Sequence, residues 1–425
     1  MRLHLHGRRP AHAGDGESRT HRDTACFLLS HKGVVPHDLA AGPRCLAEVA
    51  DGDLVLAGAH AFLYHRWRER LGREFRIVRQ VHAALRADYW LQEELCAPLL
   101  RPGDLALFPT EYARRLYLRH FPATEPRAAA VSYPLLDRLD AFPPLPVPPM
   151  NTVLRVGFLG AHSAARNFDQ VVGVFGRLHR ETGGRARLVC AGRPDSPRWQ
   201  ENAVRARLAD DWVPAAAVTM LGELAPDHLD ALFGEIDVLL CPGTSSTDAT
   251  GRAMLEALTA GVPVLAAGIG PAVELLPERN LLPTRLHADL KSTMDCPTQL
   301  GRVDEDALLH KLITRDFAPA RITDPAPRQD AAFWKALTGP PATEPSRYDH
   351  RLPGLLRIGE RATLSPATLD RAEQVCLAQL RGCRAELKNL LAESGLAPPR
   401  AAGTLPRLLN SLVLPPLPYS LPATA

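Results

Sequence analysis

One stretch of the chain, from Asp237 to Ala267, reads as an apolar strand, a loop of small polar residues, a helix and a second strand. The first strand is DVLLCPG, the helix opens at Gly251, and the second strand is VPVLAA. This order of elements directs free backbone N–H groups and the positive end of the helix dipole at whatever lies above the loop. The stretch therefore predicts an α/β fold that binds an anion, usually a phosphate, at the start of this helix.

Two acidic residues lie near the start of the same helix. Asp248 is in the loop, and Glu256 follows eight positions later in the helix. An acid two turns into the helix can reach sugar hydroxyls beside a bound phosphate. Alone, Glu256 is an ordinary helical acid, but the Ser/Thr/Gly loop before it and the GVPV turn after it favour a binding role. We interpret the stretch as a nucleotide-sugar site.

The rest of the chain is organised around similar alternations. Short apolar runs alternate with helical patterns, which is typical of parallel sheets, and the length of 425 residues predicts two or three domains. The prolines of DAFPPLPVPPMN enforce an extended connection, so we place a domain boundary there. The predicted units are an N-terminal domain at 1–148, a second domain at 149–317, and a Pro-rich linker with a helical extension at 318–425. The extension contains a helix expected from Ser365 to Glu393.

Composition narrows the classes of function. A formal net charge of +3 does not favour nucleic acid as a partner. The eight cysteines form no CxxC pair, which favours reduced thiols in a cytoplasmic protein. No apolar run approaches the roughly 20 residues that span a bilayer. The arginine-rich run from Arg66 to Arg79 is either a solvated helix face or a contact with anionic lipid, which would place the protein peripherally at the inner membrane face.

From Asp140 to about His287 the sequence resembles a known family. The segments that carry the resemblance are VGFLGAHSAARN, LVCAG, MLGEL and CPGTSSTDATGRAMLEALTAGVPVLAAG. In this order and spacing they resemble the donor-binding half of GT-B-fold, retaining glycosyltransferases of family 4, the group 1 glycosyl transferases. The resemblance implies two Rossmann-like domains that face each other across a cleft, to which this chain adds its C-terminal helical extension.

The resemblance also implies roles for individual residues. Glu256 matches the second acid of the family's E-x7-E motif, which binds the ribose of the donor, and Asp248 matches the first acid, which contacts the transferred sugar. Gly160 belongs to the glycine loop after the first strand of this half, and Arg166 lies where the family has a Lys that neutralises the leaving diphosphate. Three residues match positions whose backbone amides hold the diphosphate. They are Thr250, Gly251 and Arg252.

Two positions depart from the family pattern. Asp248 is one methylene shorter than the usual Glu. Ala161 replaces an Arg that directly follows the loop glycine, so the site loses a positive charge unless another side chain supplies it. The candidates for that charge are His162, Arg193 and Arg252.

The first half of the chain carries weaker signals for the acceptor. His82 ends the strand RIVRQVH, where family members often have a His that faces the cleft, so it is our candidate for contact with the acceptor or the donor sugar. A structural histidine is the alternative. Tyr89, Trp90 and Glu94 either line an acceptor pocket or pack in the core, and helix capping explains Thr110.

These observations predict a hexosyltransferase-type enzyme that moves a sugar from a nucleoside-diphosphate donor to an acceptor with retention of configuration. The candidate catalytic residues are Arg166, Asp248 and His82. The resemblance implies no metal and no cofactor, because side chains and the helix dipole take the metal's place. The acceptor is left open as a glycan, a lipid-linked molecule or a small molecule.

Two alternatives stay open. The first is a catalytically degenerate GT-B scaffold that binds a nucleotide sugar or a partner protein without turnover, which Ala161 and Asp248 favour. The second is a GT-B sugar-nucleotide epimerase, which would need further acid and base groups. A Rossmann dehydrogenase is disfavoured because no GxGxxG follows a first strand.

Overall fold

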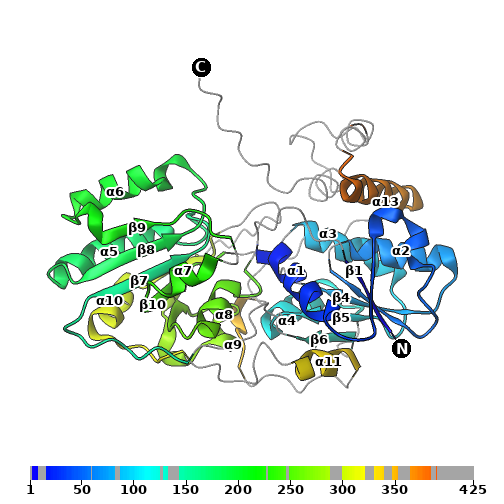
Figure 1. Ribbon diagram of the computed structural model, residues 1–425, viewed down its shortest axis with the longest axis horizontal. Helices are drawn as coiled ribbons and strands as arrows, with labels where there is room; N and C mark the ends of the chain where they lie inside the picture. Colours follow the sequence, from blue (N-terminus) through cyan, green and yellow to red (C-terminus); the bar gives the residue numbers. More distant parts are fainter. Residues whose placement is uncertain are drawn as a thin grey trace.

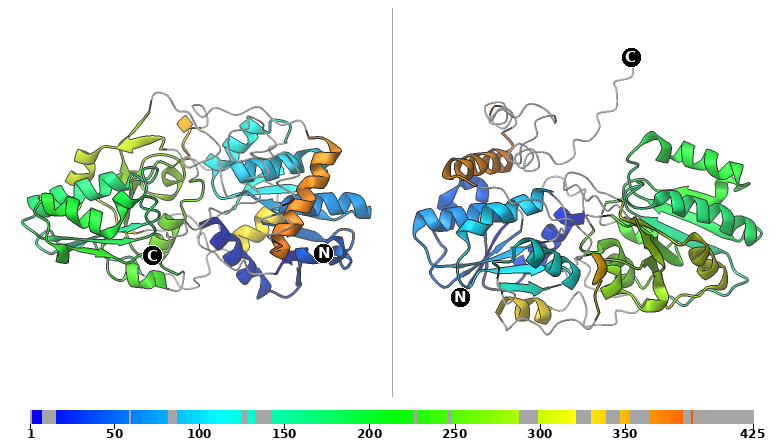
Figure 2. Two further views of the ribbon diagram at one scale, coloured as in Figure 1. Left: turned by 90° about the horizontal axis from the view of Figure 1, so that it is seen from above. Right: turned by 180° about the vertical axis from the view of Figure 1, so that it is seen from behind.

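The computed structural model describes two α/β domains, each built on a six-stranded sheet of parallel strands. The domains lie side by side (Figures 1 and 2). The predicted fold class is therefore confirmed. The described residues are 2–7, 16–58, 60–81, 87–124, 128–132, 143–225, 228–245, 248–287, 299–320, 330–338, 347–352, 364–383 and 389.

The N-terminal domain contains the sheet β2-β1-β3-β4-β5-β6. Its strands are β1 (Leu3–His6), β2 (Val34–His37), β3 (Leu54–Ala57), β4 (Arg76–Gln80), β5 (Leu105–Phe108) and β6 (Ala129–Val131). Every residue of β3 and β5 is buried. Strands of this kind are apolar throughout because helices cover both faces of a parallel sheet.

Helices cover the two faces of this sheet. They are α1 (Gly16–Leu29), α2 (Ala61–Leu71), α3 (Ala87–Cys96), α4 (Glu111–His120) and α11 (Asp330–Thr338). Successive residues of β3 point to opposite faces. Val55 packs in a core with α2, whereas Leu54 packs in a second core with Phe333 and Leu337 of α11. The chain thus returns to the N-terminal domain after it has built the second one.

The second domain contains the sheet β12-β11-β10-β7-β8-β9. Its strands are β7 (Leu154–Leu159), β8 (Ala186–Ala191), β9 (Val218–Met220), β10 (Val238–Cys241), β11 (Val264–Ala267) and β12 (Leu281–Leu282). Its helices are α5 (Phe168–Glu181), α6 (Glu201–Asp210), α7 (Leu229–Phe233), α8 (Arg252–Thr259), α9 (Ala272–Leu275) and α10 (Glu305–Thr314). An antiparallel pair, β13 (Thr284–Leu286) and β14 (Gly301–Val303), precedes α10.

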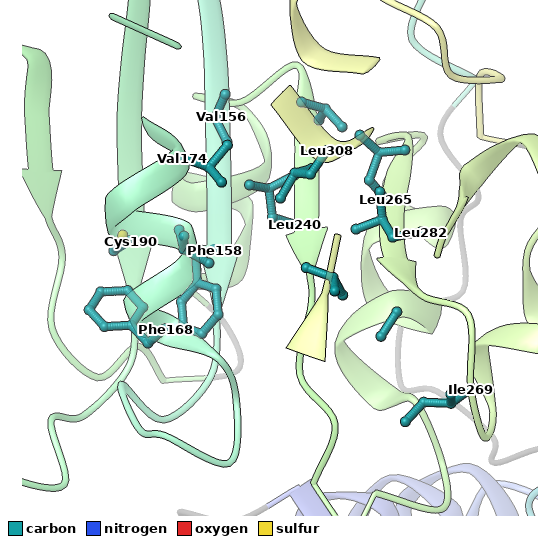
Figure 3. Close-up of a cluster of buried hydrophobic side chains, with 14 of the residues drawn as sticks. Val156, Phe158, Phe168, Val174, Cys190, Leu240, Leu265, Ile269, Leu282 and Leu308 are labelled. Atoms are coloured by element: carbon teal, nitrogen blue, oxygen red, sulfur yellow. The ribbon is translucent and has the colours of Figure 1, made fainter. Parts of the chain in front are cut away.

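The core of the second domain forms where α5 and α10 pack on the sheet. Figure 3 shows Phe158 of β7 beside Phe168 of α5, and their ring centroids lie 4.9 Å apart. Leu308 of α10 packs near Leu240 of β10 (Figure 3). These contacts fix the start of α5 against β7, and so they fix the loop that joins the two elements.

The strand order reverses beside β7. The chain runs from β7 outward to β8 and β9, and then crosses back to β10 on the other side of β7. Val156 pairs with Val238 in parallel register, and Phe158 pairs with Leu240. In open α/β sheets a ligand binds at the carboxyl ends of the strands at such a reversal. The loops after β7 and β10 are therefore the expected site.

The helical extension packs on the N-terminal domain. Its helix α13 (Pro366–Arg381) begins after Ser365, whose hydroxyl caps the helix by accepting the N–H of Thr368 at 3.2 Å. Glu373 of α13 accepts hydrogen bonds from Trp67 Nε1 at 2.9 Å and from Arg70 at 2.7 and 3.0 Å. The predicted helix therefore exists and covers α2, but it ends at Arg381, before Gly382 with φ 68°, and so it is shorter than the expected helix to Glu393.

Two arginines of the run from Arg66 to Arg79 are buried. They form neither a solvated helix face nor a surface that could contact anionic lipid. Arg68 is 1% exposed and donates to both oxygens of Asp104 at 2.7 Å. Arg79 is 2% exposed and donates to Glu93 at 3.1 and 3.2 Å. Both predicted alternatives are wrong for these residues, because their charges balance buried carboxylates.

Two further features concern the cysteines and the length of the helices. The cysteines that the structure describes are free thiols, and Cys96, Cys190 and Cys376 are buried. None of the described helices has the length and apolar character that a membrane crossing requires.

We expect Glu373→Ala to lower the free energy of unfolding by about 2–3 kcal/mol, because it leaves Trp67 and Arg70 without their shared buried acceptor. Asp370→Ala is the matched control, since the Asp370 side chain is 57% exposed in its pair with Arg66, and a surface pair contributes less than about 1 kcal/mol. Urea unfolding measures both. Equal losses for the two variants would show that α13 is not held through Glu373.

Candidate functional site

The loops after β7 and β10 bring Arg166 and Asp248 together. The two side chains form an ion pair, and Asp248 also accepts the N–H of Gly251 through Oδ1 at 3.1 Å. The charge of Asp248 raises the pKa of Arg166. Three of the predicted site residues thus meet at the start of α8, where the helix dipole is positive.

Backbone contacts join the loop after β7 to the loop after β8. Gly160, a predicted site residue, has φ 141°, and its N–H donates to Ala191 O at 3.0 Å. A Cβ on Gly192 would lie 1.8 Å from Gly160 O, so only glycine fits there. The close approach aligns His162 N with Arg193 O at 2.9 Å. Arg193 therefore lies beside the glycine loop, and its side chain is exposed.

Asn167 holds the two loops of the site together, although the sequence did not lead us to predict it as a site residue. Its side chain is fully buried and donates to the carbonyl oxygens of Pro242 at 2.9 Å and Gly301 at 3.1 Å. Its φ of 52° lies in the left-handed region that Asn tolerates. Asn167 ends the segment VGFLGAHSAARN, so the signal was present beside Arg166. It ties the β7 loop to the β10 loop and so positions Arg166.

Arg252 and Glu256 form the second part of the site. Arg252 Nε donates to Glu256 Oε1 at 2.8 Å, one turn along α8. The helix begins after Gly251, which has φ 63° and where a Cβ would lie 2.5 Å from Met254 Cε. Thr250 is half-buried in the same loop. All the predicted donor-binding residues therefore lie on the β7 loop, on the β10 loop or in α8.

The guanidinium of Arg252 also crosses to the N-terminal domain. It donates to Thr20 Oγ1 of α1 at 3.0 Å and forms an ion pair with Asp23 of the same helix. Burial opposes its charge, but the carboxylates of Glu256 and Asp23 outweigh this and raise the pKa of Arg252. Neither Thr20 nor Asp23 was predicted, because nothing in the local sequence of α1 marks them.

His162 does not supply the positive charge that Ala161 lacks. Its ring is 1% exposed and stacks on Phe168, with centroids 4.3 Å apart and planes at 8°. Burial lowers the pKa of His162 to about 4, so the imidazole is neutral at pH 7. The suggestion that His162 is the replacement cation is therefore wrong, and Arg193 and Arg252 are left.

A second contact joins the domains at α4. The carboxylate of Glu274 in α9 accepts the backbone N–H groups of Glu111 and Tyr112, both at 2.9 Å, and so it caps α4 from the other domain. Thr110 caps the same helix through Ala113 N at 3.2 Å, as predicted. Its hydroxyl also donates to Ala249 O at 2.9 Å, which connects the cap to the loop that holds Asp248.

The predicted acceptor residues are only partly placed. His82 and the side chains of Tyr89 and Trp90 lie outside the described residues. Glu94 is 6% exposed and pairs with His120 at 2.9 Å, which favours the packing alternative for this residue.

Histidines lie at the carboxyl ends of β1 and β2 and directly before α2. His6 ends β1 and is the register partner of His37, which ends β2 and whose Nε2 lies 2.6 Å from Tyr64 Oη. His60 precedes α2 with φ 61°. Burial lowers the pKa of His37 to about 3 and that of His60 to about 4, so both rings are neutral at pH 7. In the part of the chain that the structure describes, no three His, Cys, Asp or Glu side chains are placed to hold a metal ion.

We expect Asn167→Ala to lower the free energy of unfolding by about 2–3 kcal/mol, because buried carbonyl groups lose their donor. Asn202→Ala is the control, since Asn202 is exposed and bonds only locally, to Ala203 N at 2.9 Å. Chemical denaturation of both variants tests this. A loss no larger than that of the control would mean that Asn167 does not hold the two loops.

Glu274 gives a pH dependence of known sign. Burial raises the pKa of Glu274 from 4.5 to about 7, with help from Glu111 and Asp349 and against its two N–H bonds. The folded protein therefore holds this proton more tightly than the unfolded chain does. The contribution of Glu274 to stability is full below pH 4.5 and is lost as the pH rises to about 7.

Glu274→Gln should remove this dependence. The difference in unfolding free energy between wild type and variant is expected to fall with increasing pH across that interval and to be level elsewhere. Glu278→Gln, at an exposed position, is the control. Denaturation at a series of pH values measures the difference, and a level difference throughout would contradict the assignment.

Part of the chain is similar to a known protein family. Residues 150–294 match the model of the family described as "Glycosyl transferases group 1". No curated protein matches the sequence significantly. Among solved structures, HepE of Anabaena in complex with UDP is 14% identical with a TM-score of 0.50, covering 74% of this chain and 90% of that chain.

A second similar structure is the lipopolysaccharide outer core galactosyltransferase WaaB in its apo form. It is 12% identical with a TM-score of 0.52, and the match covers 79% of this chain and 99% of that chain. Identities this low establish the fold and nothing finer. The chain therefore has the GT-B fold, and its residues 150–294 match the model of the glycosyl transferases group 1 family.

Proposed function

We propose that the protein is a retaining glycosyltransferase of family 4 that transfers a hexose from a nucleoside-diphosphate donor to an acceptor, without a metal ion. The group 1 domain supports sugar transfer. HepE, one of the proteins with a similar fold, binds UDP in its solved structure, which supports a nucleoside diphosphate as the leaving group here.

One observation carries the proposal. The guanidinium of Arg166 and the backbone N–H of Gly251, directly before α8, both bind the same carboxylate, that of Asp248. Two positive groups that converge on one anion also suit a phosphate, which has the same acceptor chemistry. A diphosphate bound there would have its developing charge stabilised as the glycosidic bond breaks.

The other residues fit this arrangement. Glu256 would bind the ribose hydroxyls. The diphosphate would replace the Asp248 carboxylate at Arg166, and Asp248 would then contact the transferred sugar. Thr250 would present its backbone N–H to the phosphates, and Gly160 would shape the loop after β7 that lies beside them. His82 keeps its proposed role at the acceptor or the donor sugar. In a retaining transfer the departing phosphate can itself take the acceptor proton, so no separate base is needed.

For the acceptor and the cellular location we propose only broad classes. The acceptor stays open as a glycan, a lipid-linked molecule or a small molecule. We propose a cytoplasmic location. Contact with the inner membrane face would have to use the partly exposed arginines of the 66–79 run, such as Arg70, because Arg68 and Arg79 are buried.

The scaffold alternative has one observation in its favour. Arg166 and Arg252, the guanidinium groups of the site, are already bound by carboxylates of the protein. A site that is closed on itself in this way could hold a nucleotide without turnover. Product release distinguishes the two functions.

We expect incubation with UDP-, GDP-, ADP- or dTDP-sugars to raise the thermal unfolding temperature with one of the four nucleotides and to release its nucleoside diphosphate slowly. Glu256→Ala and Glu256→Gln should abolish both effects, because ribose binding is lost. Glu201→Ala, which removes a surface acid paired with Arg205, should leave both unchanged.

The outcomes separate the candidates. A thermal shift without release, even in cell extract, would favour the scaffold. No shift with any of the four nucleotides would refute the donor site at Gly251 and Glu256.

A further inference from the structure

The side chain of Arg252 is shared between the two domains. Its Nε donates to Glu256 within α8, and its two terminal nitrogens reach Thr20 and Asp23 of α1. Thr20 and Asp23 lie three residues apart and so share one face of their helix. Figures 1 and 2 place α1 on the side of the N-terminal domain that faces the second domain. All three nitrogens of the guanidinium therefore have partners, two of them from the opposite domain.

Two carboxylates share Arg252. Its guanidinium faces both Asp23 and Glu256. The Asp23 side chain is 2% exposed, that of Glu256 is 5% exposed and that of Arg252 is 10% exposed. Charges this well shielded from water act on a nearby ligand more strongly than surface charges do. The charge of Asp23 therefore acts on any anion at the start of α8.

The carboxylates of Asp23, Asp248 and Glu256 differ in the part of a donor that they could contact. Asp248 and Glu256 belong to the second domain and have proposed contacts with the sugar and the ribose. Asp23 has no such contact, and its bond to Arg252 is of the kind that a phosphate oxygen makes. Asp23 thus occupies the guanidinium in the way that an anionic ligand would.

We propose that Asp23 is a specificity-determining residue of the donor site, which holds Arg252 in place of a phosphate and thereby sets the affinity for a diphosphate relative to the nucleoside. This inference rests on the proposed function. When a diphosphate binds at the start of α8, it takes the Arg252 nitrogen that Asp23 holds, while Thr20 and Glu256 keep the other two. The negative charge of Asp23 therefore opposes diphosphate binding. It lowers the affinity for the phosphates and leaves the affinity for the base and ribose unchanged.

The test compares Asp23→Asn with wild type. Asparagine has the same shape and keeps an oxygen for Arg252, but it removes the charge. UDP, GDP, ADP and dTDP, and the four nucleosides without phosphate, are titrated by calorimetry. For the diphosphate that wild type binds, we expect the Kd of Asp23→Asn to fall by about tenfold, since one buried unit charge is removed. The Kd of the matching nucleoside should stay within about twofold of wild type.

Three further variants complete the test. Asp23→Glu keeps the charge and should restore the wild-type ratio of the two affinities. Asp306→Asn removes an exposed acid paired with Arg177 on the surface, and it should leave the ratio unchanged. Thr20→Asp adds a charge beside Arg252 and should weaken diphosphate binding by about tenfold, and it provides an independent test if Asp23→Asn unfolds.

The outcomes also separate this inference from the proposed function. If Asp23→Asn binds the diphosphate no more tightly than wild type, or if it tightens the nucleoside equally, the inference is overturned while wild-type binding preserves the donor site. If wild type binds none of the four diphosphates, the proposed function is refuted and this inference with it.

Discussion

The parallel pairing of β7 with β10 is the constraint on which the site depends. Because the two strands run in the same direction and in the register Phe158 to Leu240, their following loops must leave from one edge of the sheet. Asn167 then bonds the first loop to the carbonyl of Pro242 in the second. Arg166 and Asp248, 82 residues apart in the chain, meet as a consequence of this pairing. The start of α8 is held in the same place by the same loop.

The sequence predicted this half of the molecule well, because its signals are local. An apolar strand, a loop of small residues and a helix start follow one another without a gap around Gly251. Each such unit has one way to pack on a parallel sheet. The predicted contents of the β7 loop, the β10 loop and α8 therefore correspond to what the structure places there.

Contacts between the domains could not be predicted in the same way. Asp23 and Arg252 are 229 residues apart, and no periodicity in α1 distinguishes an acid that faces another domain from one that faces water. The buried pair of Arg68 and Asp104 shows the same limit. A run of arginines in the sequence predicts an exposed surface, because the carboxylate that pairs with a buried arginine lies elsewhere in the chain. Hydrophobic patterns give the face of an element and leave its polar partners open.

The return of the chain to its first domain has a mechanical consequence. Phe333 of α11 and Glu373 of α13 are both anchored in the N-terminal domain, whereas Ala320 still packs in the core of the second domain. Between α11 and α13, Asp349 accepts the N–H of Gly270 and Arg347 donates to the carbonyl oxygen of Leu276, so residues 347–352 contact the second domain again. The chain therefore passes between the domains before β7, after Ala320, after α11 and before α13. These connections restrict a relative movement of the domains more than a single linker would.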